Sequence, residues 1–150
     1  MYDPFQSAYK PGFSTETAIL RLHNDLSVAC QENLISCVVF LDLSSAFDTI
    51  DHDILIDRLH RRFGLNGAVL RWFRSYLSNR SVAVRVGDSF STYKPFSFGV
   101  PQGSVLGPRL FSMYLDPVCS IISVYNICHI AYADDITLYT SFSLSNSDAQ

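Results

Sequence analysis

The chain has 150 residues, of which 48% are hydrophobic, and a formal net charge of −3. This length is enough for one domain with a hydrophobic core, and the composition excludes a disordered tail. No apolar stretch approaches transmembrane length and no signal-peptide pattern opens the chain, so we expect neither a membrane span nor secretion. The four cysteines lack paired metal-type spacing and are interpreted as small core residues in a reducing compartment.

Helical and extended patterns alternate in the amino-terminal half. Ser14 is a candidate N-cap, and apolar residues at helical spacing predict an amphipathic helix over about Thr15 to Cys30. The apolar, β-branched run from Cys37 to Leu43 predicts a buried strand, with Asp42 where the strand leaves the sheet. Two further helical stripes follow, one of Ile54, Leu55, Leu59 and Phe63 ended by Gly64, and one of Val69, Leu70, Phe73 and Leu77 after a capping Asn66.

The middle of the chain predicts a hairpin and then a short helix. Residues 81–86 alternate at period two, and Gly87-Asp88 turns the chain back toward residues 90–98. After a loop rich in glycine and proline, Leu110 to Leu115 favours a helix that Pro117 breaks or kinks.

The last predicted element is a second hairpin over His129 to Phe142, with an Asp pair at its bend and a polar tail at residues 143–150 that we expect to fray. Strands and helices mix without strict alternation, which favours an α+β fold.

The most informative residues are the adjacent carboxylates of Asp134 and Asp135, which lie between two apolar runs. Ionised carboxylates are costly in such surroundings unless a cation pairs with them, and Mg²⁺ prefers carboxylate and phosphate oxygens. If the two strands lie side by side, Asp42 comes close to Asp134, and two bridged metal ions can promote an in-line phosphoryl displacement. The alternatives are a solvated polar turn for the pair and an N-cap or turn role for Asp42.

Three segments carry a specific resemblance. Residues 40–48 (FLDLSSAFD) resemble the first palm motif of reverse transcriptases, residues 99–108 (GVPQGSVLGP) the middle motif, and residues 132–135 (YADD) the Tyr-x-Asp-Asp box. Residues 42–52 and 6–18 resemble the non-LTR, LINE-type retrotransposon branch.

The resemblance implies the palm, with partial fingers, of a right-hand polymerase, an antiparallel sheet backed by helices. Its motifs would occupy about residues 38–48, 99–108 and 130–138 of one partial domain over residues 1–150. The amino-terminal fingers strands and the thumb are expected to be absent.

The implied activity is RNA-templated DNA synthesis by two-metal nucleotidyl transfer. By resemblance, Asp42, Asp134 and Asp135 are catalytic and hold two Mg²⁺ ions, or Mn²⁺, with the backbone carbonyl of Leu43. Asp135 is the less certain ligand, because neighbouring strand side chains point to opposite faces.

The resemblance also assigns the nucleotide site. Phe47 would form a steric gate against the ribose 2′-hydroxyl, with Ala46 letting the sugar approach. Gln102 and Gly103 would form a platform under the nucleotide, and Tyr132 would pack near the primer terminus. Phe47 and Tyr132 could instead be core residues, and the glycine-rich segment a mobile loop.

Charge is unevenly distributed, since residues 58–85 contain seven arginines and no Asp or Glu. Within this stretch Arg61, Arg62, Arg71 and Arg74 are candidate contacts to nucleic-acid phosphates. The alternative is a solvated helix face.

The expected partners are an RNA template, a DNA primer and a dNTP, without a membrane; the oligomeric state stays open. The expected location is intracellular, in the nucleus or cytoplasm, within the ribonucleoprotein of a mobile element. One rival is an RNA-dependent RNA polymerase, but those enzymes typically have Gly before the Asp pair and small polar residues where Phe47 stands. Another is a catalytically inactive remnant or a co-opted nucleic-acid-binding protein. The 150 residues alone are expected to be inactive.

Overall fold

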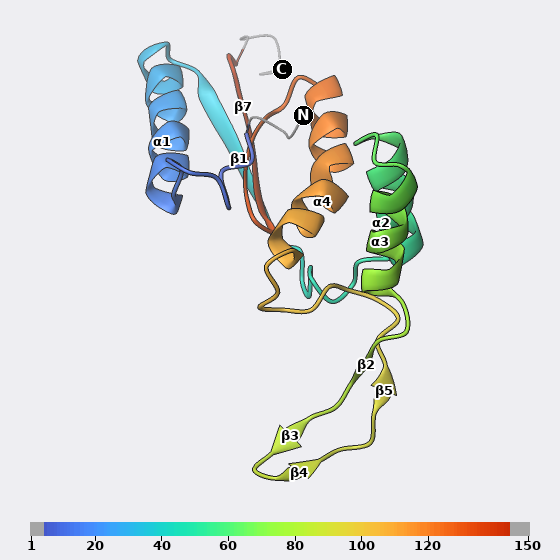
Figure 1. Ribbon diagram of the computed structural model, residues 1–150. Coiled ribbons are helices and arrows are strands. Elements are labelled where there is room, and N and C mark those ends of the chain that lie inside the picture. Colours follow the sequence, from blue (N-terminus) through green and yellow to red (C-terminus); the bar gives the residue numbers. More distant parts are fainter. Residues whose placement is uncertain (1–4, 145–150) are drawn as a thin grey trace, which may run out of the picture. The chain divides into compact units, whose positions relative to one another are not determined.

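The computed structural model describes residues 5–144, which form two compact units. One unit comprises residues 45–114, and the other comprises residues 5–44 together with residues 115–144. Helices and antiparallel strands mix along the chain, so the expected α+β class is confirmed (Figure 1). Most of the tail that we expected to fray, residues 145–150, lies outside the described part.

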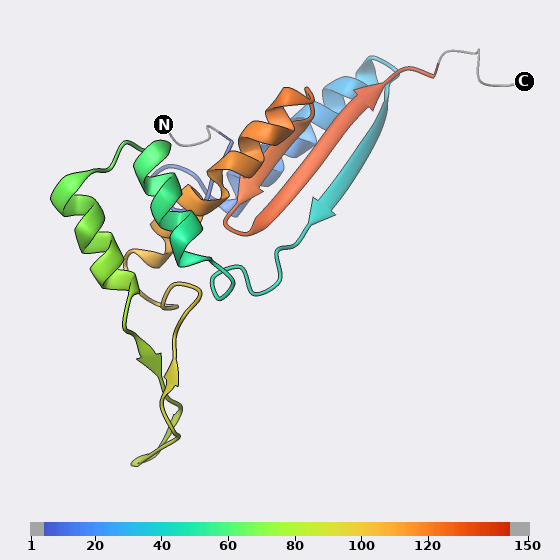
Figure 2. The same cartoon turned by 90° about the vertical axis from the view of Figure 1, so that its right-hand side faces the viewer.

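The second unit is built on a three-stranded antiparallel sheet in the order β1–β7–β6 (Figure 2). Strand β1 covers Ile35–Leu41, β6 covers Cys128–Tyr132, and β7 covers Asp135–Phe142. β7 pairs with all of β1, from Ile35 opposite Phe142 to Leu41 opposite Ile136, and with all of β6. The expected hairpin at the end of the chain is therefore confirmed.

Helix α1 (Thr15–Gln31) packs against β1 and β6 of this sheet. Ser14 caps it as expected, because its hydroxyl accepts from the Thr17 amide while the Thr17 hydroxyl accepts from the Ser14 amide. Ala18 of α1 meets Ile130 and Tyr139 in a buried cluster, which joins the helix to the sheet. Burial of Ile130 contributes about 1.5–3 kcal/mol, and the single methyl group of Ala18 contributes less.

The prediction of a buried β1 over residues 37–43 was wrong in two respects. The strand begins and ends two residues earlier, and it lies at an edge of the sheet with Val39, Phe40 and Leu41 exposed. A short apolar run rich in β-branched and aromatic residues favours an extended segment, but its burial depends on how many strands and helices cover it. The cysteines were misread for the same reason, since Cys119 is buried but Cys30, Cys37 and Cys128 are exposed.

The unit of residues 45–114 contains two consecutive helices, α2 (His52–Arg61) and α3 (Gly67–Leu77). The Asp51 carboxylate caps α2 by accepting from the Ile54 amide at 2.9 Å. Asn66 precedes α3 as expected but forms no side-chain cap, because its amide donates to the Gly64 carbonyl instead.

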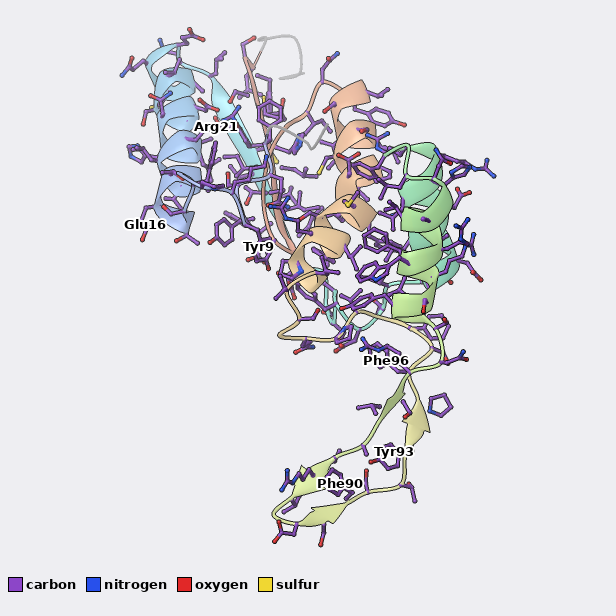
Figure 3. All side chains as sticks on the ribbon, in the orientation of Figure 1. Tyr9, Glu16, Arg21, Phe90, Tyr93 and Phe96 are labelled. Carbon is purple, nitrogen blue, oxygen red and sulfur yellow. The ribbon has the colours of Figure 1, made fainter. Side chains whose placement is uncertain are left out.

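A long hairpin follows in the same unit. Its inner ladder pairs β2 (Ser81–Val82) with β5 (Lys94–Pro95), and its outer ladder pairs β3 (Arg85–Val86) with β4 (Ser89–Phe90). The expected turn at Gly87 is confirmed. Phe90 and Tyr93 are largely exposed (Figure 3), so the hairpin forms with little core of its own.

Helix α4 (Gly107–Val124) runs through Pro117, so of the two expected effects of this proline, a break or a kink, the break does not occur. A proline inside a helix costs about 3 kcal/mol. Leu110, Phe111 and Leu115 are each at most 6% exposed, and at about 1.5–3 kcal/mol per buried side chain they outweigh that cost. None of the helices within residues 5–144 combines the length and the apolar character needed to cross a membrane.

We predict that Tyr139→Phe lowers the free energy of unfolding by about 1.5 kcal/mol, the lower end for a hydrogen bond to a charged group. The Tyr139 hydroxyl donates to the Asp25 carboxylate at 2.6 Å, and burial, then this bond, raises the pKa of Tyr139 above its usual value of 10. A raised pKa means that this stabilisation is present below about pH 10 and is lost as the pH rises further. Urea unfolding between pH 7 and pH 11 measures both effects.

The control is Tyr125→Phe, because Tyr125 is 72% exposed and its hydroxyl forms no hydrogen bond with the part of the chain that the structure describes. Equal unfolding free energies for the two variants would contradict the assignment.

Candidate active site

The carboxylate of Asp42 lies just beyond the paired part of β1. Leu41 is the last paired residue of that strand and faces Ile136, so the next positions at this end of the sheet are Asp42, just after β1, and Asp135, the first residue of β7. The antiparallel register thus brings acidic residues from distant parts of the sequence to one end of one sheet. Asp42 and Asp135 are both exposed there.

The hairpin bend between β6 and β7 carries the other acidic residue. Tyr132 pairs with Asp135, which leaves Ala133 and Asp134 as a two-residue loop. Ala133 has a φ of +55°, the left-handed region that matches two-residue hairpin loops but is unfavourable for a residue with a Cβ. Asp134 lies in this loop and not in a strand, so strand alternation does not fix the direction of its side chain. The residue is half-buried.

A pocket of about 370 Å³ opens between α1 and the sheet. Asp42, Asp135 and Tyr132 line it together with apolar residues of α1 and of the three strands. The structure therefore brings these three predicted site residues to one pocket. Asp134 is not among the lining residues and lies next to them in the bend.

The oxygen donors fit a hard divalent cation. Within residues 5–144 no group of three or more His, Cys, Asp or Glu side chains is placed to enclose a metal ion. Mg²⁺ typically binds through one or two carboxylates and keeps water and phosphate ligands, so two acids at an open sheet end suit it better than a closed cage would. Leu43, whose carbonyl was the predicted extra ligand, is half-buried beside Asp42.

Gln6 is a residue of this site that sequence reasoning missed. Its Nε2 donates to the Ala133 carbonyl at 3.2 Å, and its Oε1 accepts from the amides of Ala133 at 3.1 Å and Ala8 at 2.9 Å. Gln6 is 5% exposed, so these bonds form away from water. A lone glutamine in a polar segment gives no local signal of such contacts.

Tyr9 lies near the same bend, at the end of the amino-terminal segment (Figure 3). Partial burial, followed by the negative charge of Asp134 and the neighbouring Tyr132, raises the pKa of Tyr9 above its usual value of 10. The phenol therefore stays protonated at neutral pH and offers a donor near Asp134.

The nucleotide-site candidates belong to the unit of residues 45–114. Ala46 is buried, and the Phe47 ring stacks on Phe111 with 4.9 Å between centroids. The Gln102 amide donates to both oxygens of the Asp48 carboxylate, at 3.1 Å each. Phe47 is thus partly packed, which is also what the alternative role of a core residue predicts. The contact between Gln102 and Asp48 was not predicted.

The glycine-rich segment is anchored rather than mobile at its start. The Gly99 amide donates to the Ile50 carbonyl at 2.7 Å, and the Val100 amide donates to the Phe47 carbonyl at 2.8 Å. A His52 ring nitrogen also lies 2.7 Å from the Gly99 carbonyl oxygen. Gly103, by contrast, is exposed with open space around it.

The predicted arginine contacts lie on or next to α2 and α3. Arg61 pairs with Asp57 at 2.7 Å, but both side chains are largely exposed, so the pair contributes only about 0–1 kcal/mol. Arg71 and Arg74 are exposed, and their side chains form no hydrogen bond or ion pair with the rest of residues 5–144. Arg62, just after α2, is exposed as well. Beside them, Trp72 is 53% exposed and stacks on Tyr76.

Comparisons with known proteins agree with this geometry. The sequence profile of the family described as "Reverse transcriptase (RNA-dependent DNA polymerase)" matches residues 1–146. The chain is 34% identical, over 97% of its length, to a probable RNA-directed DNA polymerase from transposon BS of Drosophila melanogaster. It is 30% identical, over 91% of its length, to the RNA-directed DNA polymerase from the mobile element jockey of the same species. It spans only 16% and 15% of those two proteins.

A solved structure shows the same fold. Telomerase from Candida albicans, in complex with a fragment of telomeric RNA, superposes with a TM-score of 0.65 over 85% of this chain and 26% of its own. The sequence identity is 13%, so this likeness bears on the fold alone. It confirms the right-hand polymerase fold that the sequence motifs implied.

We predict that Gly99→Ala destabilises the chain more than Gly103→Ala does. Both glycines have a positive φ, of +83° and +77°, which costs an alanine about 1 kcal/mol or more. Only at Gly99 would the new Cβ meet backbone, 2.7 Å from the Phe47 carbonyl oxygen and 2.8 Å from the Asp48 Cα. Urea unfolding of both variants measures the difference, and equal losses would show that the segment is not anchored as described.

Proposed function

The chain belongs to the reverse transcriptase (RNA-dependent DNA polymerase) family, and on that premise we propose that it supplies the metal-binding part of the palm in a retrotransposon enzyme. That enzyme extends a DNA primer on an RNA template. The observation that carries the proposal is the convergence of Asp42 and Asp135 on one pocket beside the Asp134 bend.

The proposed reaction joins the primer 3′-oxygen to the α-phosphorus of a dNTP and breaks the bond to the leaving pyrophosphate. Two Mg²⁺ ions, when bound, lower the pKa of the 3′-hydroxyl and neutralise the triphosphate. The carboxylates of Asp42, Asp134 and Asp135 and the backbone carbonyl of Leu43 would hold these ions. Mn²⁺ has similar ligand preferences and is expected to substitute.

The incoming nucleotide is proposed to contact the unit of residues 45–114. Phe47 would exclude the ribose 2′-hydroxyl by its bulk, and its stacking on Phe111 supports this role by restricting the ring. Gln102 uses its Nε2 on Asp48, which leaves its Oε1 as an acceptor for a base or sugar. Ala46 and Gly103 would allow close approach because their side chains are small or absent, and Tyr132 would pack near the primer end.

The proposed partners are the RNA template, the DNA primer and the dNTP. The proposed location is the ribonucleoprotein of a mobile element, in the nucleus or cytoplasm. The relatives named above are polymerases of such elements.

We predict that residues 5–142, grafted into the matching region of an active LINE-type enzyme, support Mg²⁺-dependent dNTP incorporation that Asp42→Asn and Asp134→Asn abolish. Each change keeps the side-chain size but removes a charged ligand. Metal ions supply several kcal/mol of charge stabilisation, so incorporation should fall by about 100-fold or more.

The matched control is Asp53→Asn, which removes an exposed carboxylate from the first turn of α2. It should leave incorporation unchanged. Full activity in both the Asp42 and the Asp134 variants would show that the catalytic assignment is wrong.

We also predict that the chain binds primer–template weakly and in a salt-sensitive way, through Arg61, Arg62, Arg71 and Arg74. Changing all four to Ala should reduce affinity at low salt and flatten the salt dependence, by up to about 0.9 in the log–log slope for each phosphate that is no longer neutralised. The fluorescence of Trp72, the only tryptophan in the chain, reports binding beside Arg71.

Arg85→Ala is the control, because Arg85 belongs to strand β3 of the hairpin and not to the α2–α3 segment that carries the other four arginines. An unchanged affinity in the fourfold variant would identify the cluster as a solvated face.

A further inference from the structure

We propose that Gln6 is a positioning residue that fixes the Ala133–Asp134 bend and thereby aims the acidic pair at the divalent cation. This role rests on the proposed function. In this role Gln6 is not a ligand of the nucleotide or the cation, and it acts through the backbone of Ala133.

The hydrogen bonds of Gln6 are matched to one residue of the bend. Its side-chain amide both donates to the Ala133 carbonyl and accepts from the Ala133 amide, at 3.2 and 3.1 Å. These two groups belong to the peptide units on either side of Ala133, so neither unit can rotate without breaking a buried bond. Because the second of these units leads directly into Asp134, Gln6 sets where the Asp134 side chain starts.

The bend needs such support because of its own conformation. Ala133 has a positive φ, a conformation that persists in a residue with a Cβ only where the surroundings hold it. Ala133 is also 9% exposed, so its backbone groups have little access to water as a replacement partner. A bend without Gln6 would thus have a buried donor and acceptor unpaired and would be free to relax to negative φ.

Gln6 can hold the bend because its own segment is held by the sheet. The Ser7 amide donates to the Ala131 carbonyl at 2.8 Å, and the Ala131 amide donates to the Phe5 carbonyl at 3.0 Å, so the segment runs parallel beside β6. The Arg21 guanidinium lies 4.2 Å from the Phe5 ring centroid, which ties the segment to α1. Figure 3 marks Arg21 on that helix and Tyr9 on the segment.

The test uses the whole chain, labelled with ¹⁵N, and two NMR readouts. The first is amide hydrogen exchange at Ala133, which reports the hydrogen bonds between Gln6 and Ala133, here called the clamp. The second is the broadening of the Asp134 and Asp135 amide signals by Mn²⁺, which reports cation binding at the pair. Gln6→Met keeps the length of the side chain but removes both amide functions, and Gln31→Ala changes an exposed glutamine at the end of α1 as the control.

In Gln6→Met we expect exchange at Ala133 to rise by about tenfold or more, the loss expected for one buried hydrogen bond. The Mn²⁺ concentration for half-maximal broadening should rise by about fivefold or more, while exchange in the core of α1 stays unchanged. Gln31→Ala should change neither readout.

Gln6→Glu keeps the test decisive if Gln6→Met does not fold. A protonated Glu side chain can accept from the Ala133 amide and donate to its carbonyl, whereas the ionised form cannot donate. Burial raises the pKa of such a carboxyl group, so exchange protection at Ala133 should be close to that of the unchanged chain near pH 5 and lost near pH 8. The unchanged chain, measured at both pH values, corrects for the general dependence of amide exchange on pH.

Three results overturn the proposal. If the protection of the Ala133 amide from exchange does not depend on Gln6, the hydrogen bonds of Gln6 do not hold the bend. Faster exchange with unchanged Mn²⁺ broadening makes Gln6 a structural residue only. Absence of Mn²⁺ broadening at Asp134 and Asp135 in the unchanged chain removes the proposed metal site, and the positioning role with it, which distinguishes failure of the function from failure of the clamp.

Discussion

The pairing of β1 with β7 is the interaction on which the candidate site depends. It joins residues 35–41 to residues 136–142 along the whole length of β1. A slip of one residue would move every side chain of β1 to the other face of the sheet and would separate Asp42 from the position beside Asp135. The pocket between α1 and the sheet and the proximity of Asp42 to Asp135 follow from this register, and the pairing of β6 with β7 places the Asp134 bend beside them.

Local signals were enough to predict most elements but not their surroundings. The capping box at Ser14, the turn at Gly87 and the period-two alternation before it depend on neighbouring residues, and these elements formed as expected. The exposure of β1 and the absence of a break in α4 at Pro117 depend on which distant segments pack nearby, so the sequence pattern did not predict the exposure and did not decide between a break and a kink. Propensity sets the local conformation, whereas burial is decided by tertiary contacts.

The same division explains the candidate site. Asp42 and the Asp134–Asp135 pair could be predicted as site residues because each follows an apolar run of the sequence. Gln6 could not be found, since its value lies in contacts to Ala133, 127 residues away in the sequence. The bond between Gln102 and Asp48 spans 54 residues and was missed for the same reason. Residues that position a site through distant contacts are thus harder to predict from sequence than the charged residues of the site.

The most direct test of the account is a crystal structure of the chain grown with Mn²⁺, with the ion located by its anomalous scattering. We expect an ion with oxygen ligands from Asp42 and from at least one of Asp134 and Asp135, at the roughly 2.0–2.2 Å typical of small divalent cations. An ion bound elsewhere, or carboxylates of Asp42 and Asp134 more than roughly 10 Å apart, well beyond the span of a two-metal site, would contradict the account.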